Sequence, residues 1–240
     1  MLKRSLQIAL LLSLEAAAHA QTTPAVMETL GVKIGDTSAQ IDKVLVGLGY
    51  KLVRKEDYAA AFGMPARPQS REYQKLVAKP GSLPAEMGYV MIGFGQKSST
   101  AVAIARREQF DRPVSRVEME KALSAKYGPP TRNTGNAGEL EWMALEPNSY
   151  KPSDSPQDCR VRVGGQVNYG TDFKRLANCK KTVSVILSEL SNSGVEFQKI
   201  QVSMVDFTAY KDEASALAAL EAQQRKDEIE KRRQVPVPKI

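Results

Sequence analysis

The chain has 240 residues, of which 42% are hydrophobic and 25% charged, and its net charge at pH 7 is +7. This is enough chain to bury a real core in one domain or two small ones. The positive charge favours anionic lipid headgroups or cell-wall polymers as partners, or else only keeps a small protein soluble. The single histidine, His19, lies in a segment that we expect to be removed, which excludes His-dependent catalysis and His-containing zinc sites in the mature chain.

Residues 1–20 have the three parts of a secretory signal peptide. Lys3 and Arg4 give a positive start, Leu6 to Leu14 form an apolar run, and Ala18-His19-Ala20 is a small-x-small cleavage pattern. The alternative, a membrane anchor, is disfavoured because the run has about half of the ~20 apolar residues that a bilayer requires. We therefore predict cleavage after Ala20, a periplasmic or secreted location, and no transmembrane span in the mature protein.

The only two cysteines are Cys159 and Cys179. In an oxidising exported compartment such a pair most simply forms a disulfide. The loop that it would close is worth ~3 kcal/mol in the chain-entropy model. A redox pair is the alternative, but that function usually requires C-x-x-C spacing.

The first predicted module covers residues 21–110. Thr37 and Gln40 form a capping box, and the next apolar residues recur at helical spacing up to Gly47 and Gly49. A strand is expected over Tyr50 to Arg54. The proline-containing stretch Glu56 to Pro84 is interpreted as a long loop. A hairpin is then predicted from the strands Met87–Gly95 and Thr100–Gln109.

The second predicted module, residues 111–208, contains the cysteines and begins with a similar helix. Ser115 and Glu118 form a second capping box, and Tyr127-Gly128-Pro129-Pro130 ends the helix. The two helices match at a constant offset, which indicates either a duplication or two independently capped helices. Residues 147–158 are expected to form a loop, and strands are expected over residues 139–145, 160–169, 182–190 and 199–207.

Residues 209–240 are predicted to form a C-terminal helix and tail. Apolar residues from Tyr210 to Leu220 provide a docking stripe, whereas Gln223 to Arg233 contains only Ile229. Acid-to-base pairs at i, i+4 in this second half favour a solvated helix. We expect the second half to be an extension outside the folded core.

The catalytic and metal motifs that we sought are absent, and we predict no catalytic residues, metal site or cofactor. Glu139 and Glu141 lie on one face of a strand beside Trp142, which is compatible with a carboxylate pair acting on sugars. The simpler interpretation is an exposed strand face, with Leu140 and Trp142 turned inward. The best candidate for an anionic contact is a basic cluster that consists of Arg106, Arg107, Arg112 and Arg116. The alternative is that these residues form a solvated strand end.

Two short stretches resemble a known family. Gly31 to Thr37 with the helix that follows, and Lys126 to Thr131, resemble BamE-like (SmpA/OmlA) outer-membrane assembly modules. The resemblance implies helices packed on a three-stranded antiparallel sheet and a role that is not enzymatic. This chain departs from the family in having no lipid-anchor cysteine, a longer chain and an added C-terminal helix.

Together these features predict an α+β fold, with antiparallel sheets packed by short helices and a long C-terminal helix. We expect an exported, non-enzymatic binding or scaffold protein of the cell envelope. Its expected partner is an envelope protein, an anionic polymer or a lipid surface, and not nucleic acid. The alternative function is a carboxylate-based hydrolase that acts on a cell-wall or other polymer.

Overall fold

The computed structural model describes residues 24, 26–58, 60, 66–77, 85–133, 138–145, 179–188, 191 and 194–233. Three helices and ten strands follow one another along these residues. Their bounds are β1 Glu28–Thr29, β2 Val32–Lys33, α1 Ser38–Gly47, β3 Lys51–Tyr58, β4 Arg67–Val77, β5 Ala85–Phe94, β6 Ala101–Ser115, α2 Arg116–Tyr127, β7 Arg132–Asn133, β8 Glu139–Leu145, β9 Cys179–Ser188, β10 Glu196–Asp206 and α3 Phe207–Arg233.

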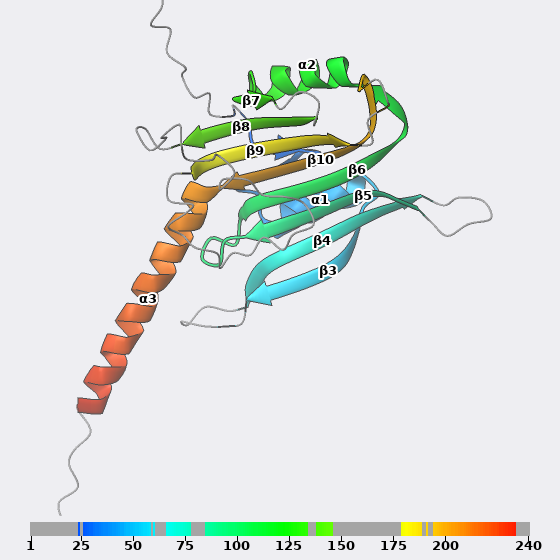
Figure 1. The fold of residues 1–240 in the computed structure, drawn as a ribbon. Coiled ribbons are helices and arrows are strands. Elements are labelled where there is room, and N and C mark those ends of the chain that lie inside the picture. Colours follow the sequence, from blue (N-terminus) through cyan, green and yellow to red (C-terminus); the bar gives the residue numbers. More distant parts are fainter. Residues whose placement is uncertain are drawn as a thin grey trace, which may run out of the picture.

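Eight of the strands form one antiparallel sheet in the order β3-β4-β5-β6-β10-β9-β8-β7 (Figure 1). The chain builds each half of this sheet in the same way, as a helix followed by four strands that pair in sequence. The last strands of the two halves, β6 and β10, pair at the centre from Ser115–Glu196 to Ala103–Val205. The α+β class and the antiparallel arrangement are therefore confirmed, and the sheet continues without a break across the predicted module boundary at residue 110.

The two faces of the sheet differ in character because side chains alternate along each strand. The face that includes Val90, Ile104 and Val202 packs in one buried cluster with Leu45 of α1 and Leu123 of α2. We call it the helix face. The other side, which we call the open face, carries the side chains that alternate with these. Among the described helices, only α3 packs an apolar residue against it: Phe207 lies beside Ala103 and Val205.

Capping determines where the two helices begin, as the sequence predicts. Thr37 accepts from the Gln40 backbone N–H at 3.4 Å, and Gln40 Oε1 accepts from the Thr37 N–H at 2.8 Å. Ser115 accepts from the Glu118 N–H at 3.4 Å, and α2 ends at Gly128, whose φ of 87° favours glycine. Both helices therefore begin at the predicted residues.

The predicted loop from Glu56 to Pro84 is wrong, because it contains the 11-residue strand β4. Pro68 is tolerated near the beginning of this strand, where a bulge between Glu56 and Asp57 interrupts the pairing with β3. Tyr73 at the middle of β4 is fully buried, and its hydroxyl donates to Asp42 Oδ1 of α1 at 2.6 Å. Polar side chains along the rest of the strand hide its alternation from sequence analysis.

The strands of the second half lie close to their predicted positions. The strand over residues 139–145 is β8, with the same bounds, and the strands expected over 182–190 and 199–207 are β9 and β10. Cys179 is fully buried at the beginning of β9. Cys159, the predicted loop over 147–158 and the predicted strand over 160–169 lie outside the described residues, as does the signal segment, so the disulfide stays a prediction.

Helix α3 begins on the sheet and runs away from it (Figure 1). Glu213 fixes its first turns, because this carboxylate accepts from the backbone N–H groups of Lys97 at 2.5 Å and Ser98 at 2.9 Å in the β5–β6 turn. Lys211 Nζ also donates to the Cys179 carbonyl at 3.0 Å. From Glu221 to Arg232 every residue is exposed, as expected for an extension.

Candidate functional site

The sheet separates the first two arginines of the predicted basic cluster. Arg106 and Arg107 are neighbours on β6, so they point to opposite faces. Arg106 lies on the helix face, where it pairs with Glu108 and its Nη1 donates to Thr29 Oγ1 at 3.1 Å. Burial lowers the pKa of the Arg106 guanidinium. This arginine is therefore part of the core.

The other two arginines lie near the end of β6 and at the beginning of α2. Arg112 is exposed at the end of β6. Arg116 pairs with Glu120 one turn along α2, with its Nε 2.7 Å from Oε1, and its side chain is 14% exposed. The four predicted residues thus occupy separate environments, and Arg107 is the one that faces a concave surface.

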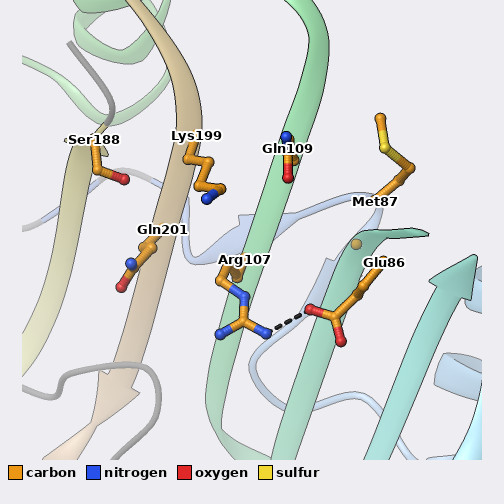
Figure 2. Close-up of a pocket in the computed structure, with 8 residues that line it drawn as sticks. Glu86, Met87, Arg107, Gln109, Ser188, Lys199 and Gln201 are labelled. Carbon is orange, nitrogen blue, oxygen red and sulfur yellow. Dashed lines mark hydrogen bonds and ion pairs between the residues drawn. The ribbon is translucent and has the colours of Figure 1, made fainter.

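That surface is a half-open groove of about 500 Å³ on the open face (Figure 2). Strands β5, β6, β9 and β10 all contribute to it. The residues that line it are Glu86, Met87, Gly88, Arg107, Gln109, Ser188, Lys199 and Gln201. We call it the polar groove. Its volume falls within the range of ~300–1,000 Å³ that is usual for small-ligand sites.

The strand register explains why these residues meet. Lys199 of β10 lies directly across from Gln109 of β6 on one side and from Ser188 of β9 on the other. Two register positions further along, on the same face, Gln201 lies across from Arg107. Cross-strand partners such as these have Cβ atoms ~4.5–5.5 Å apart. Two short rows of polar side chains therefore form the floor of the groove.

A network of polar contacts holds Arg107 in place. Its guanidinium pairs with Glu86, and Figure 2 shows the two side chains pointing toward each other. The other Glu86 oxygen accepts from Gln74 Nε2 at 3.2 Å. The guanidinium also lies 5.5 Å from the centre of the Tyr89 ring. Burial and a hydrogen bond to Glu72 raise the pKa of Tyr89 to about 12, so this hydroxyl stays protonated at neutral pH.

The groove also contains a hydroxyl with unused hydrogen-bonding capacity. Ser188 Oγ is buried, and no group in the described part of the chain bonds to it. A buried polar atom without a partner costs ~1–3 kcal/mol. Such an atom at the edge of a groove is a position where a ligand oxygen or a water molecule lowers the free energy.

Sequence analysis left open a carboxylate pair on β8, with an exposed strand face as the simpler interpretation. Leu140 and Trp142 are buried as expected, but Glu141, expected on an exposed face, is completely buried. β8 is paired on both sides, with β7 at Glu141 and with β9. Among the described residues that line the polar groove, Glu86 is the only carboxylate, and it is paired with Arg107.

Sequence analysis missed most of the polar groove. Lys199, Gln201 and Ser188 were assigned to strands and Gln109 to a strand end, but no motif marks any of them as a site residue. Polar residues that alternate with buried ones in two neighbouring strands would have signalled a polar sheet face. The groove itself depends on the β6–β10 pairing, which joins residues about 90 positions apart in the chain.

The described residues contain no cluster of three or more His, Cys, Asp or Glu side chains suited to a metal ion. None of the described helices combines the length and the apolar character that spanning a membrane requires. Comparison with known protein families, curated proteins and solved structures gave no match.

Proposed function

We propose that this chain is an exported, non-enzymatic binding protein of the cell envelope, and that the open face of its sheet makes the contact. The observation that carries the proposal is the polar groove at the centre of that face. Two helices pack on the other face, whereas this groove is a concave surface on the open face. The partner is an envelope protein or an anionic envelope component.

The charges of the groove favour binding over hydrolysis. Of the described residues that line it, two are cations, Arg107 and Lys199, and one is a carboxylate, Glu86. Hydrolysis of a glycoside by the usual route requires two carboxyl groups on either side of the scissile bond, one of which must be free to transfer a proton. A lone carboxylate held by an arginine meets neither requirement. We therefore place the hydrolase function second.

The order of elements supports the proposal that two related modules make up the body. Thr37 and Ser115 cap their helices in the same way, and Leu45 and Leu123, eight residues further on in each case, are both buried. Four sequential strands follow each helix. Such a pair of modules joined at β6 and β10 gives one wide sheet, which provides a larger surface than either half alone.

Site-specific photo-crosslinking in intact cells tests this function. A benzoylphenylalanine placed at position 109, in the polar groove, should yield an adduct with one defined envelope component. The matched control is the same crosslinker at position 117 of α2, where Val117 is 70% exposed on the opposite side of the molecule. Adducts at both positions, or at neither, would reject the open face as the contact surface.

A further inference from the structure

We propose that the polar groove binds an acidic sugar, with the carboxylate or phosphate group between Lys199 and Arg107 and the sugar hydroxyls on Gln109, Gln201 and Ser188. This inference rests on the proposed function and names the ligand class of the same site. A single ring or disaccharide unit is the expected ligand, since the cavity of about 500 Å³ is open on one side.

The acidic group follows from the two cations. Lys199 and Arg107 lie two register positions apart on the adjacent strands β10 and β6, so their side chains enter the same face from neighbouring rows. Glu86 takes one side of the Arg107 guanidinium and Tyr89 lies against its face, which leaves further N–H donors of the fork. Guanidinium and ammonium donors bind oxyanions through short, charge-assisted hydrogen bonds.

Pre-organisation makes Arg107 suited to this role. Its side chain is held from two sides before any ligand arrives, because Glu86 is itself fixed by Gln74. Ordering a free long side chain on binding costs ~0.5–1.5 kcal/mol, a cost that a fixed guanidinium largely avoids. Among the described lining residues, Arg107 and Lys199 are cations and Glu86 is a carboxylate.

The sugar body follows from the neutral residues. Gln109, Gln201 and Ser188 each donate and accept hydrogen bonds, as sugar hydroxyls do. Ser188 Oγ is buried with its capacity unused. A hydroxyl of the ligand that reaches this atom satisfies it, whereas an apolar ligand leaves it without a partner. The groove therefore discriminates in favour of a ligand that carries both an anion and hydroxyl groups.

Isothermal titration calorimetry of the exported chain with matched sugars tests the inference. The probes are cellobiouronic acid against cellobiose, and glucose 6-phosphate against glucose, so that each pair differs in the acidic group. We expect at least one acidic sugar to bind tenfold or more tightly than its neutral counterpart. The pair that shows the difference identifies the source of the anion as carboxylate or phosphate.

Variants assign the binding to the groove. Lys199→Gln should weaken binding of the acidic sugar tenfold or more, and Ser188→Ala should weaken acidic and neutral sugars alike. Lys121→Gln on α2, an exposed lysine on the other side of the molecule, is the matched control and should leave binding unchanged. Thermal unfolding of each variant shows that the fold is retained.

Two results would overturn the inference. One is equal or absent binding of the acidic and neutral sugars, and the other is a Lys199→Gln variant that binds as the parent does. Adducts at position 109 together with a failure of every sugar would reject the sugar and leave the proposed contact surface intact. An absence of both would reject the two proposals together.

Discussion

Arg106 and Arg107 are adjacent in the sequence and have opposite roles in the structure. Arg106 points into the helix face, where its side chain is 16% exposed and pairs with Glu108 among apolar neighbours. Arg107 points to the open face, where its side chain is 43% exposed and lines the polar groove. One strand thus places one arginine on the helix face and the next in the polar groove, and the period of two along the strand determines the face of each. Under the proposed function, the first contributes to stability and the second to binding.

The same comparison extends to the whole sheet. On the helix face several buried polar atoms bond within the protein: the Tyr127 hydroxyl donates to the Glu28 carbonyl at 2.9 Å, and Trp142 Nε1 donates to the Gly128 carbonyl at 2.7 Å. On the open face the groove residues bring donors and acceptors to solvent. Substitutions on the helix face should therefore change the free energy of unfolding, and those in the groove should change binding.

The largest expected effect is on the partly buried ion pair of the helix face, in which the Arg106 and Glu108 side chains are 16% and 25% exposed. Arg106→Met leaves the Glu108 carboxylate without this partner. Removing one member of a fully buried pair costs ~3–5 kcal/mol, so for this partly exposed pair we expect a loss of up to ~3 kcal/mol. The double variant Arg106→Met/Glu108→Leu should recover much of this loss, because no charge is then left unpaired. Urea unfolding measures both, and a double variant as unstable as the single one would contradict the explanation.

Arg107→Gln is the matched control on the open face. Its pair with Glu86 is partly exposed, and such pairs are worth ~0–1 kcal/mol. We expect the free energy of unfolding to change by no more than this. Equal losses for Arg106→Met and Arg107→Gln would remove the distinction between the two faces.

Gly88→Ala should be the next most harmful change. A Cβ at this position on the helix face would overlap the Tyr50 hydroxyl and lie 2.9 Å from Tyr50 Cζ. Overpacking of this kind costs ~1–3 kcal/mol. Adding Tyr50→Phe removes the hydroxyl, which has no hydrogen-bond partner, and should restore part of the loss. Additive effects of the two substitutions in thermal unfolding would show that the clash is not the cause.

Alkaline pH should destabilise the fold through the buried tyrosines. Burial raises the pKa of Tyr127 to about 12, whereas in the unfolded chain it titrates near its ordinary value of 10.0. Between these pH values the unfolded state loses a proton that the native state keeps, so stability falls as pH rises, by at most ~1.4 kcal/mol per pH unit for this group. Tyr127→Phe should make the decline between pH 10 and 12 less steep in urea unfolding.

The sequence was a good guide to local structure and a poor guide to the site, for reasons that particular residues show. Helix starts depend on residues three apart, so Thr37 with Gln40 was sufficient to place α1. Strand β4 was missed because its burial rests mainly on Arg71 and Tyr73. The groove brings together Gln109, Lys199 and Ser188 only through long-range pairing, and no local pattern specifies that register.

The smallest effect on stability is expected in the exposed second half of α3, which extends beyond the sheet. Truncation after Gln223 removes the end of α3, where residues 224–232 are all solvent-exposed. Glu213, which accepts from the backbone of the β5–β6 turn, is retained. Stability should change by no more than ~0.5 kcal/mol, as for surface substitutions generally. Glu213→Ala is the matched control, since it leaves two backbone N–H groups without their acceptor and should cost more.

This truncation also tests whether the exposed second half of α3, here called the arm, takes part in ligand binding at the polar groove. A solvated helix without a packed face has little tertiary support, so a helix of this length that extends from the body contributes its charged pairs and its reach rather than core packing. If the arm only extends from the body, the truncated chain should bind acidic sugars as the full chain does. A large loss of stability in thermal unfolding would show that the arm packs on the body, and a loss of sugar binding alone would place part of the ligand contact on α3.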